Sequence, residues 1–451
     1  MDNSAVHFTD QSGVKTTCLT RSLKLGLGFF FRTRFRFILP LLVFGISLTV
    51  SAWVWRTYLF NDHLHQARQA ATAGRTSTAV SHLQFCESID VEDREVMLLA
   101  ALVARMAQTW ERAERVLEHY WTRYGDDEQL TFERLLLKAA RDDTDSVAGL
   151  LKTRIAQGGD AARLCRQALV SGQIREFRYA EAQARIDAWR AESPSDPLAN
   201  LLQGRLQEQL FKFQEAAETY GAIVARDPSH HEARLRFVIV LMQQRQAGDA
   251  LVHLRVLREA LPDNSEVAVQ WALALRQVGR TDEAISALDE ALTKHPNLSV
   301  ALVERGTLAL NSGDDKLAAD LLVKALRTDP GAIGTRNLYV SALTRLGRTE
   351  ELARELESVK TLTADSDRLT ELIHGALQSR PNDPNPPYEI AGIALRAGQP
   401  SEAIRWYQTA LKRSPNHGPT HLALAVIYQE MGNPVLATQH RALGSNAPGR
   451  R

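Results

Sequence analysis

The chain has 451 residues, of which 44% are hydrophobic, 24% are charged and 7% are aromatic. Its 54 Lys and Arg residues nearly balance 53 Asp and Glu residues, and a formal net charge of +1 argues against a chain built to bind polyanions. The three cysteines, Cys18, Cys86 and Cys165, form neither a CxxC motif nor a Cys–His spacing typical of metal ligands. The composition predicts an all-helical protein with no disulfide and no thiolate metal site.

Residues 37–55 carry no charge, and a bilayer core about 30 Å thick is spanned by roughly 17–25 apolar residues in a helix. Basic residues precede this segment and aromatic residues follow it, as the two interfaces of a membrane favour: Arg32, Arg34, Arg36, Trp53, Trp55 and Tyr58. By the positive-inside rule we predict a cytoplasmic tail (residues 1–36), one transmembrane helix (37–55) and an extracytoplasmic remainder. The small residues that end at Ala52 leave cleavage as a signal peptide open.

After this segment, prolines and small residues recur with a period of 34. Five prolines follow one another at this interval: Pro194, Pro228, Pro262, Pro296 and Pro330. Alanines keep step with them at Ala79, Ala113, Ala148, Ala182, Ala216, Ala250, Ala284, Ala318, Ala403 and Ala437. Four residues later the same phase holds bulky side chains, including Leu83, Leu117, Tyr220, Leu254, Leu288, Leu322 and Tyr407. Glycines that can end a first helix stand at Gly74, Gly279, Gly313, Gly347, Gly398 and Gly432.

This pattern of prolines, alanines, bulky residues and glycines resembles the tetratricopeptide repeat, a helix–turn–helix unit that stacks into a solenoid. The resemblance implies an all-α fold: an α-solenoid of such repeats preceded by one transmembrane helix. Pro330 and Pro381 are one and a half periods apart, and the period resumes at Pro415. We therefore predict a main array over residues 56–364, an extra helix and a joint over 365–381, and carboxy-terminal repeats over 382–447.

No motif of a phosphate-binding loop, dinucleotide site, zinc protease, serine hydrolase or calcium loop is present in the sequence. His230-His231-Glu232 is the nearest approach to a metal cluster, and we interpret it as a solvated turn between repeats. We expect no enzyme activity, no cofactor, no metal, no nucleic acid and no small-molecule substrate. The expected partners are other proteins or peptide segments.

In the family that the repeats resemble, the first helix of each unit lines a concave surface. Carrying those positions over predicts a mildly basic groove, which would suit an acidic segment of a partner. Its candidate residues are Arg205, Gln209, Lys212, Gln243, Arg276, Arg280, Asn311, Arg345 and Arg348. The alternative interpretation, the solvated face of a helical array, stays open.

These observations predict a single-pass protein of the cell membrane with its amino terminus in the cytoplasm and its repeats outside, in the periplasm if the host is a bacterium with two membranes. The expected function is that of a scaffold or adaptor, with envelope assembly, secretion and polysaccharide export as candidate settings. Two alternatives remain: a non-catalytic regulatory subunit of a membrane enzyme complex, and a secreted binding protein after signal cleavage.

Overall fold

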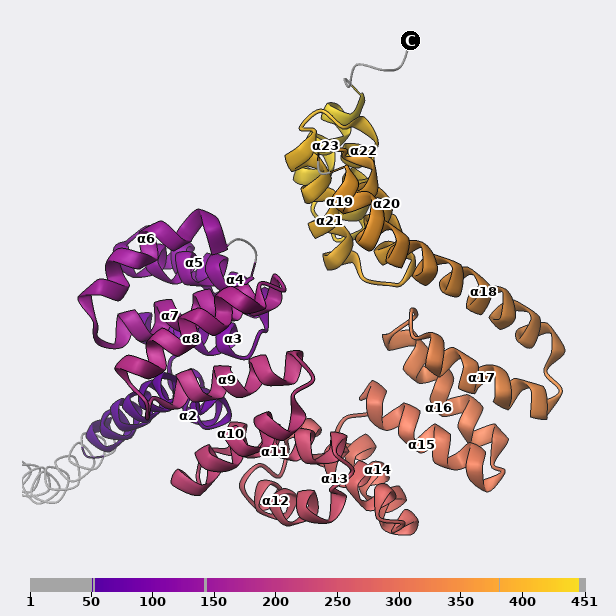
Figure 1. Cartoon of the computed structure of the whole chain (residues 1–451), viewed down its shortest axis with the longest axis horizontal. Coiled ribbons are helices and arrows are strands. Elements are labelled where there is room, and N and C mark those ends of the chain that lie inside the picture. Colours follow the sequence, from indigo (N-terminus) through magenta and orange to yellow (C-terminus); the bar gives the residue numbers. More distant parts are fainter. Residues whose placement is uncertain (1–50, 52, 142–143, 381, 446–451) are drawn as a thin grey trace, which may run out of the picture. The chain divides into compact units, whose positions relative to one another are not determined.

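The computed structural model describes residue 51 and residues 53–141, 144–380 and 382–445, and the regular elements in these ranges are helices (Figure 1). The predicted cytoplasmic tail and all of the predicted transmembrane segment except residues 51 and 53–55 lie outside the described residues. In the described ranges, no helix is both long and apolar enough to cross a membrane. Cys86 and Cys165 are buried free thiols, and burial raises the pKa of each to about 11.

The chain divides between Leu206 and Gln207 into two compact units. The first unit begins with a helix over residues 53–72. Its other helices are α2 (Thr76–Ile89), α3 (Arg94–Met106), α4 (Trp110–Tyr124), α5 (Glu128–Arg141), α6 (Thr144–Gln157), α7 (Gly159–Arg175), α8 (Tyr179–Glu192) and most of α9 (Pro197–Gln209).

The second unit starts near the end of α9. Its helices are α10 (Phe213–Arg226), α11 (His231–Gln243), α12 (Ala247–Ala260), α13 (Ser265–Gln277), α14 (Thr281–Lys294), α15 (Ser299–Ser312), α16 (Asp315–Thr328), α17 (Ile333–Leu346), α18 (Thr349–Glu371), η1 (Leu372–Ala376), α19 (Leu377–Ser379), α20 (Asn385–Arg396), α21 (Pro400–Arg413), α22 (Gly418–Glu430) and α23 (Pro434–Ser445).

Within each unit the helices pair into hairpins, and the hairpins stack in chain order. A first helix contacts the second helix of its own hairpin, as α3 contacts α4 in the first unit and α13 contacts α14 in the second (Figure 1). First helices also contact the first helix of the next hairpin: α3 with α5, α5 with α7, α11 with α13, α13 with α15 and α15 with α17. Because a single hairpin exposes an apolar face, this stacking is what buries the core.

The predicted ladder of alanines lies where the two helices of a hairpin cross. Nine of its ten alanines are at most 1% exposed, and the bulky residues four positions later are at most 4% exposed. In one first helix the small residue is Gly306, whose added Cβ would lie 2.9 Å from Leu322 Cγ of the second helix. A larger residue at this crossing would force the backbones apart, so the small side chain sets their distance.

The one alanine of the predicted ladder that is not fully buried is Ala148. Ala148 is only half-buried, whereas Val147 and Leu151 of the same helix are buried at 2% and 1% exposure. The core-facing stripe of α6 is therefore shifted by one residue, and the prediction of Ala148 as the crossing residue is wrong. Leu151 rather than the polar Lys152 thus enters the core, which follows from the greater gain in burying an apolar side chain.

Ten hairpin turns in the described residues place one residue in the left-handed conformation. The six predicted glycines occupy it, with φ between 66° and 82°. Four other hairpins place Gln108, Phe177, Phe211 or Arg245 there, with φ from 57° to 62°. Since this conformation costs a non-glycine residue roughly 1–2 kcal/mol, stacking of the repeats imposes the turn even where the sequence resists it.

The predicted extra helix over 365–381 is not a separate element. Residues 349–379 form one helical run, in which α18 passes through the π-helical stretch η1 into α19 (Figure 1). Two bidentate ion pairs join this run to α20, with Arg368 on Glu389 (2.6 and 2.9 Å) and Arg396 on Asp365 (2.6 and 2.8 Å). The added half-period therefore lengthens the second helix of a hairpin and gives α20 a surface to pack on. The predicted domain limits otherwise remain predictions.

Gly172 in α7 tests how closely the first helices approach one another. A Cβ added there would lie 2.0 Å from the carbonyl oxygen of Ala139 in α5. We expect Gly172→Ala to destabilise the fold by about 1–3 kcal/mol or more, because backbone atoms have to move. Urea unfolding of a fragment that begins at Asn61 measures this change. Gly149→Ala is the control, because its Cβ would meet nothing within 4 Å, and it is expected to be neutral or stabilising.

Candidate partner-binding site

A row of amide side chains runs along the first helices of the second unit. Its members lie one period apart near the carboxy-terminal ends of α9, α11, α13 and α15: Gln209, Gln243, Gln277 and Asn311. All four are exposed, and none has a hydrogen-bond partner among the described residues. We call these four residues the amide row. Each amide offers two N–H donors and one carbonyl acceptor to an outside group.

The spacing of the amide row suits an extended chain. Packed helices lie about 8–10 Å apart, so successive amides are expected to be separated by about that distance. An extended backbone advances about 3.3 Å per residue, which places one amide beside every third residue of a bound segment. One turn before two of the amides, Ile239 and Leu273 present half-buried apolar surface on the same helix face. This face can thus bind a backbone and contact apolar side chains.

The structure puts the predicted site residues to different uses. Gln209, Gln243 and Asn311 belong to the amide row, and Gln277 was missed although it stands one period after Gln243 and the period would have found it. The cations, in contrast, are largely engaged within the molecule. Arg276 lies 3.2 Å from Glu304, and Arg345 lies 3.2 Å from Asp315 and donates to the Leu310 carbonyl at 2.9 Å.

Three predicted cations are not on a first helix at all. Lys212, Arg280 and Arg348 immediately precede α10, α14 and α18, and each pairs with a glutamate three residues later at 3.2, 2.6 and 2.7 Å. A cation at a helix amino terminus opposes the helix dipole, and the glutamate in the first turn offsets it. Of the predicted cations, Arg205 alone has no ion-pair partner among the described residues, and it lies in the first unit. A row of free cations is therefore not what the second unit presents.

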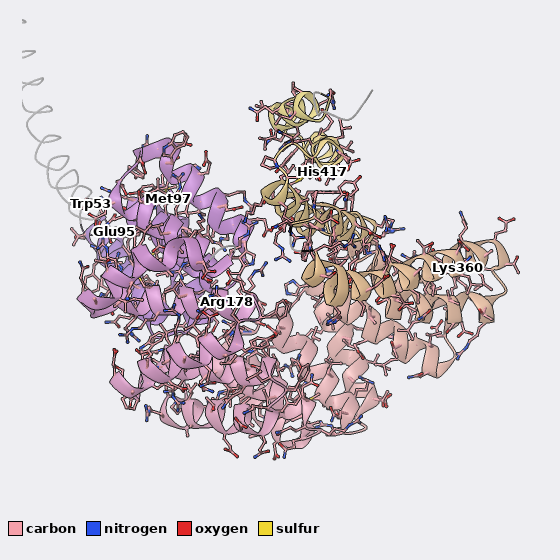
Figure 2. The ribbon with its side chains drawn as sticks, turned by 45° about the horizontal axis from the view of Figure 1, so that its top comes forward. Trp53, Glu95, Met97, Arg178, Lys360 and His417 are labelled. Atoms are coloured by element: carbon pink, nitrogen blue, oxygen red, sulfur yellow. The ribbon has the colours of Figure 1, made fainter. Side chains whose placement is uncertain are left out.

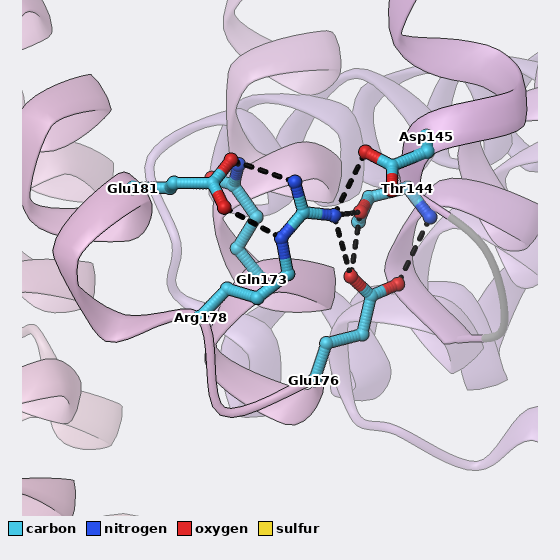
Figure 3. A network of polar contacts seen from close by, with 6 residues as sticks. All are labelled: Thr144, Asp145, Gln173, Glu176, Arg178 and Glu181. Atoms are coloured by element: carbon cyan, nitrogen blue, oxygen red, sulfur yellow. Dashed lines mark hydrogen bonds and ion pairs between the residues drawn. The ribbon is translucent and has the colours of Figure 1, made fainter. Parts of the chain in front are cut away.

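Arg178 shows the same helix-start arrangement in the first unit, in its most developed form (Figure 3). Its guanidinium binds Glu181 through two nitrogens at 2.7 Å each, and reaches Asp145 at 2.8 Å and Glu176 at 3.1 Å. Glu176 in turn accepts hydrogen bonds from the backbone N–H and the hydroxyl of Thr144 at the start of α6. The hydrogen bond to Glu181 is the main cause that raises the pKa of Arg178. This network joins consecutive hairpins and engages one guanidinium with three carboxylates.

Ion pairs between successive first helices recur at one position of the repeat. The partners of each pair are separated by the same interval in the sequence: Arg105–Glu133, Glu208–Arg236 and Arg276–Glu304, at 3.7, 2.8 and 3.2 Å. The order of the charges is reversed in the middle pair. At the same position Met242 and Gln270 are uncharged, and Leu310 with Leu338 is apolar. Neighbouring first helices thus meet at the same repeat position, whether the two side chains there are charged, polar or apolar.

These ion pairs differ in how deeply their side chains are buried. Arg105 is 2% exposed and binds Gln167 at 2.5 Å, and burial lowers its pKa while burial raises the pKa of Glu133. Such a buried pair costs much to desolvate, so it adds more to the specificity of packing than to stability. Burial also opposes the charge of Arg236, but Glu208 and Tyr220 outweigh it and raise its pKa.

His230, the first residue of the candidate metal cluster, does not lie in a solvated turn. It is 1% exposed at the amino terminus of α11, where its Nδ1 accepts a hydrogen bond from the Ala233 N–H at 3.2 Å. The interpretation as a solvated turn is therefore wrong for this residue. In the described part of the chain, no group of three or more His, Cys, Asp or Glu side chains is placed to hold a metal ion.

Stacked two-helix hairpins with a small residue at each crossing define the class of helical-repeat solenoids, whose extended helix surfaces bind partners. Family models of the tetratricopeptide repeat match residues 209–272 and 269–333, the part of the chain that carries the amide row. Residues 209–333 are therefore tetratricopeptide repeats, as the resemblance predicted. Proteins with these repeats mediate contacts between proteins.

Two curated relatives come from Pseudomonas. Cellulose synthase operon protein C of Pseudomonas fluorescens is 25% identical over 285 residues, which are 58% of this chain and 21% of that protein. The TPR repeat-containing protein PA4667 of Pseudomonas aeruginosa is 29% identical over 162 residues, 32% of this chain and 28% of that protein. The chain thus spans less than a third of the length of these relatives.

Solved structures share the repeat with lower similarity. A tetratricopeptide repeat protein from Parabacteroides merdae is 13% identical, covers 56% of this chain and 93% of its own, and has a TM-score of 0.31. The human IFIT1 dimer with PPP-AAAA is 15% identical, covers 83% and 80%, and has a TM-score of 0.33. At these scores neither structure bears on the ligand of this chain.

Because Glu208 and Arg236 have the opposite charge order, we predict that the charges of Arg276 and Glu304 can be exchanged. We expect Arg276→Glu to destabilise the fold by about 1 kcal/mol, a modest value because the arginine is partly exposed and screened by solvent. Adding Glu304→Arg copies the order of Glu208 and Arg236 and should restore most of the loss. A double-mutant cycle in urea measures the coupling. Equal stability of the single and double variants would show that the two helices do not meet here.

Proposed function

We propose that this chain is a membrane-anchored scaffold whose first-helix surface in the second unit binds an extended segment of a partner protein. The amide row supports this proposal: four exposed amides without internal partners recur once per repeat. Exposed amides can each bond an N–H and a C=O of a passing backbone, so they hold a segment regardless of its side chains. Apolar surface at Ile239 and Leu273 would then select among segments.

The ion pairs of the second unit favour backbone recognition over recognition of an acidic segment. To bind a carboxylate, Arg276 would have to leave Glu304, and Arg280 would have to leave Glu283, with which it makes two bonds of 2.6 Å. Each exchange replaces one ion pair with another and gains little in water. The amides, in contrast, have no hydrogen bond to another described residue that would have to break.

The first described helix supports the membrane anchor. Trp53 (Figure 2), Trp55 and Tyr58 at the start of residues 53–72 are 67%, 63% and 62% exposed, whereas Leu64 and Ala67 of the same helix are buried in the first core. Exposed aromatic side chains with polar edges are typical of a membrane interface. Nine residues separate Trp55 from Leu64, about 14 Å of helix. The proposed anchor therefore holds the first hairpin close to the bilayer.

The relative named cellulose synthase operon protein C supports polysaccharide export as the setting among the three candidates, because its similarity covers 58% of this chain. In that setting the scaffold would hold export proteins beside the membrane by their extended segments. The absence of enzyme activity and of nucleic-acid binding are parts of the same proposal.

The amide row is tested by removing two of its central members. We expect Gln243→Ala with Gln277→Ala to leave the fold intact, since both are exposed, and to weaken partner binding at least tenfold, about 1.4 kcal/mol, by the loss of two backbone contacts. Partners captured from a detergent extract by the wild type are identified by mass spectrometry and then titrated against the variant. Gln408→Ala with Gln439→Ala removes two exposed amides outside the row and is the control. Equal loss in both variants would contradict the proposal.

Orientation is tested with a reporter that is active only outside the cytoplasm. Fused after Arg451, the reporter should be active, because the arginines before residue 37 retain the tail inside. Fused after Arg36, it should be inactive. The opposite pair of results would reverse the topology, and an active soluble fusion would indicate cleavage of the segment.

A further inference from the structure

One position of the first helix binds the carbonyl oxygen of the proline that precedes the repeat. The donor and the proline are six residues apart in each case: Asn200–Pro194 (3.2 Å), Arg234–Pro228 (2.7 Å), Arg336–Pro330 (2.6 Å) and His421–Pro415 (2.9 Å). The residue 19 positions after the donor, on the second helix, faces it. That residue is His253 for Arg234, Glu355 for Arg336 and His440 for His421.

In the last hairpin this position holds two histidines in direct contact. Nδ1 of His421 in α22 lies 2.8 Å from Nδ1 of His440 in α23. Nε2 of His421 faces the Pro415 carbonyl, which can only accept, so this nitrogen carries a proton. Nδ1 of a neutral His421 is then an acceptor, and Nδ1 of His440 has to donate to it. The contact therefore needs one proton, and only one, between the two rings.

In the described part of the chain, no carboxylate offsets the lowering of the pKa of His440. His421 is 5% exposed, and the ring of Tyr428 stacks on His440 at 5.5 Å. Burial lowers the pKa of His440, and the neighbouring His421 lowers it further. α22 is the helix packed against α23, and His417 before it is held by Thr420 at 2.6 Å. Burial lowers the pKa of His417, and the carboxylate of Asp383 offsets part of this effect. The carbonyl of Asp383 accepts a hydrogen bond from Arg413 of α21 at 2.9 Å.

We propose that the His421–His440 contact is a proton-controlled latch, which closes the hairpin of α22 and α23 at neutral pH and opens it in mild acid. One added proton is tolerated, because it can enter on Nε2 of His440 while Nδ1 still donates to His421. A second proton on Nδ1 of His421 puts two N–H groups against each other and breaks the contact. The hairpin then gains protons by opening.

The size of the effect follows from linkage. A histidine ring in water has an ordinary pKa of about 6.5, while the closed contact leaves no room for a second proton between the two Nδ1 atoms. Lowering the pH from 7.5 to 5.0 then favours opening by about 30-fold. The stability that the latch contributes is present above the ordinary histidine pKa and is lost as the pH falls below it.

A second histidine pair stands at the same repeat position in the first described hairpin. His63 Nδ1 lies 2.9 Å from His82 Nδ1, again 19 residues apart, and burial followed by His63 lowers the pKa of His82. Here Asp62 lies near enough to raise the pKa of His82 in part. We therefore expect this hairpin to open less in acid than the last one.

Hydrogen–deuterium exchange of the full chain in detergent micelles tests the latch at pH 7.5 and 5.0, with rates corrected for intrinsic exchange. In the wild type, protection of α22 and α23 should fall about 30-fold in acid. Protection of α13 and α14, which hold Ala268 and Ala287 at the two positions, should not change in the same molecules. A parallel loss in both hairpins, or no loss in α22 and α23, would overturn the proposal without any variant.

His440→Gln supplies the matched variant, because a glutamine amide can donate to a neutral His421 or accept from a protonated one. Its α22 and α23 should keep their protection within about threefold over the same pH range. If it is already unprotected at pH 7.5, His421→Asn with His440→Thr replaces it, since Asn200 and Thr219 hold these positions elsewhere in the chain. His374→Gln, an exposed histidine in η1, is the control and should behave as the wild type. A fall in acid as large as that of the wild type, in His440→Gln or in the double variant, would place the switch elsewhere.

Discussion

The contact between two helix backbones at the small residue of each hairpin is the constraint on which the rest of this structure depends. Alanine or glycine at the crossing lets the helices pack closely, and the bulky residue one turn later fills the space beside them. Within each unit, hairpins that share this crossing stack in chain order. A residue one period further on therefore returns to the same place, and any chemistry repeated at that interval becomes a row on the surface.

The repeat separates positions that hold the array together from positions that are free to bind. Ion pairs at one fixed interval join successive first helices, and ion pairs three residues apart offset the unfavourable cation at the start of second helices. In both kinds of ion pair, the charged side chains are bound to other residues of the same molecule. The amide row lies on the same first helices but has no such partner. Because its members are neutral, it offers hydrogen bonds without the cost of removing a charge from water.

Variation within the strict repeat gives individual hairpins their own properties. The position that bonds the proline carbonyl holds Asn, Arg or His, and the residue facing it on the second helix changes with it. Among the side chains at these two positions, only histidine has an ordinary pKa near neutral pH. Lengthening has the same local character: the run from α18 through α19 adds half a period, and ion pairs to α20 take up the change.

The sequence by itself determined the period, the hairpin, the buried alanines and the turn glycines, because these depend on spacing along one chain and on the intrinsic conformations of Gly, Ala and Pro. It also placed three of the four amides, since a surface row needs only the period. Tertiary structure decided which charges were free. Arg276 is exposed and lies at the expected position of the repeat, but it forms an ion pair with Glu304 of the next hairpin. Whether these two side chains come within reach depends on how the helices are packed. It likewise shifted the core stripe of α6 from Ala148 to Val147, buried His230, and continued α18 through the predicted extra helix, where no proline or glycine lies between Thr349 and His374 to stop it.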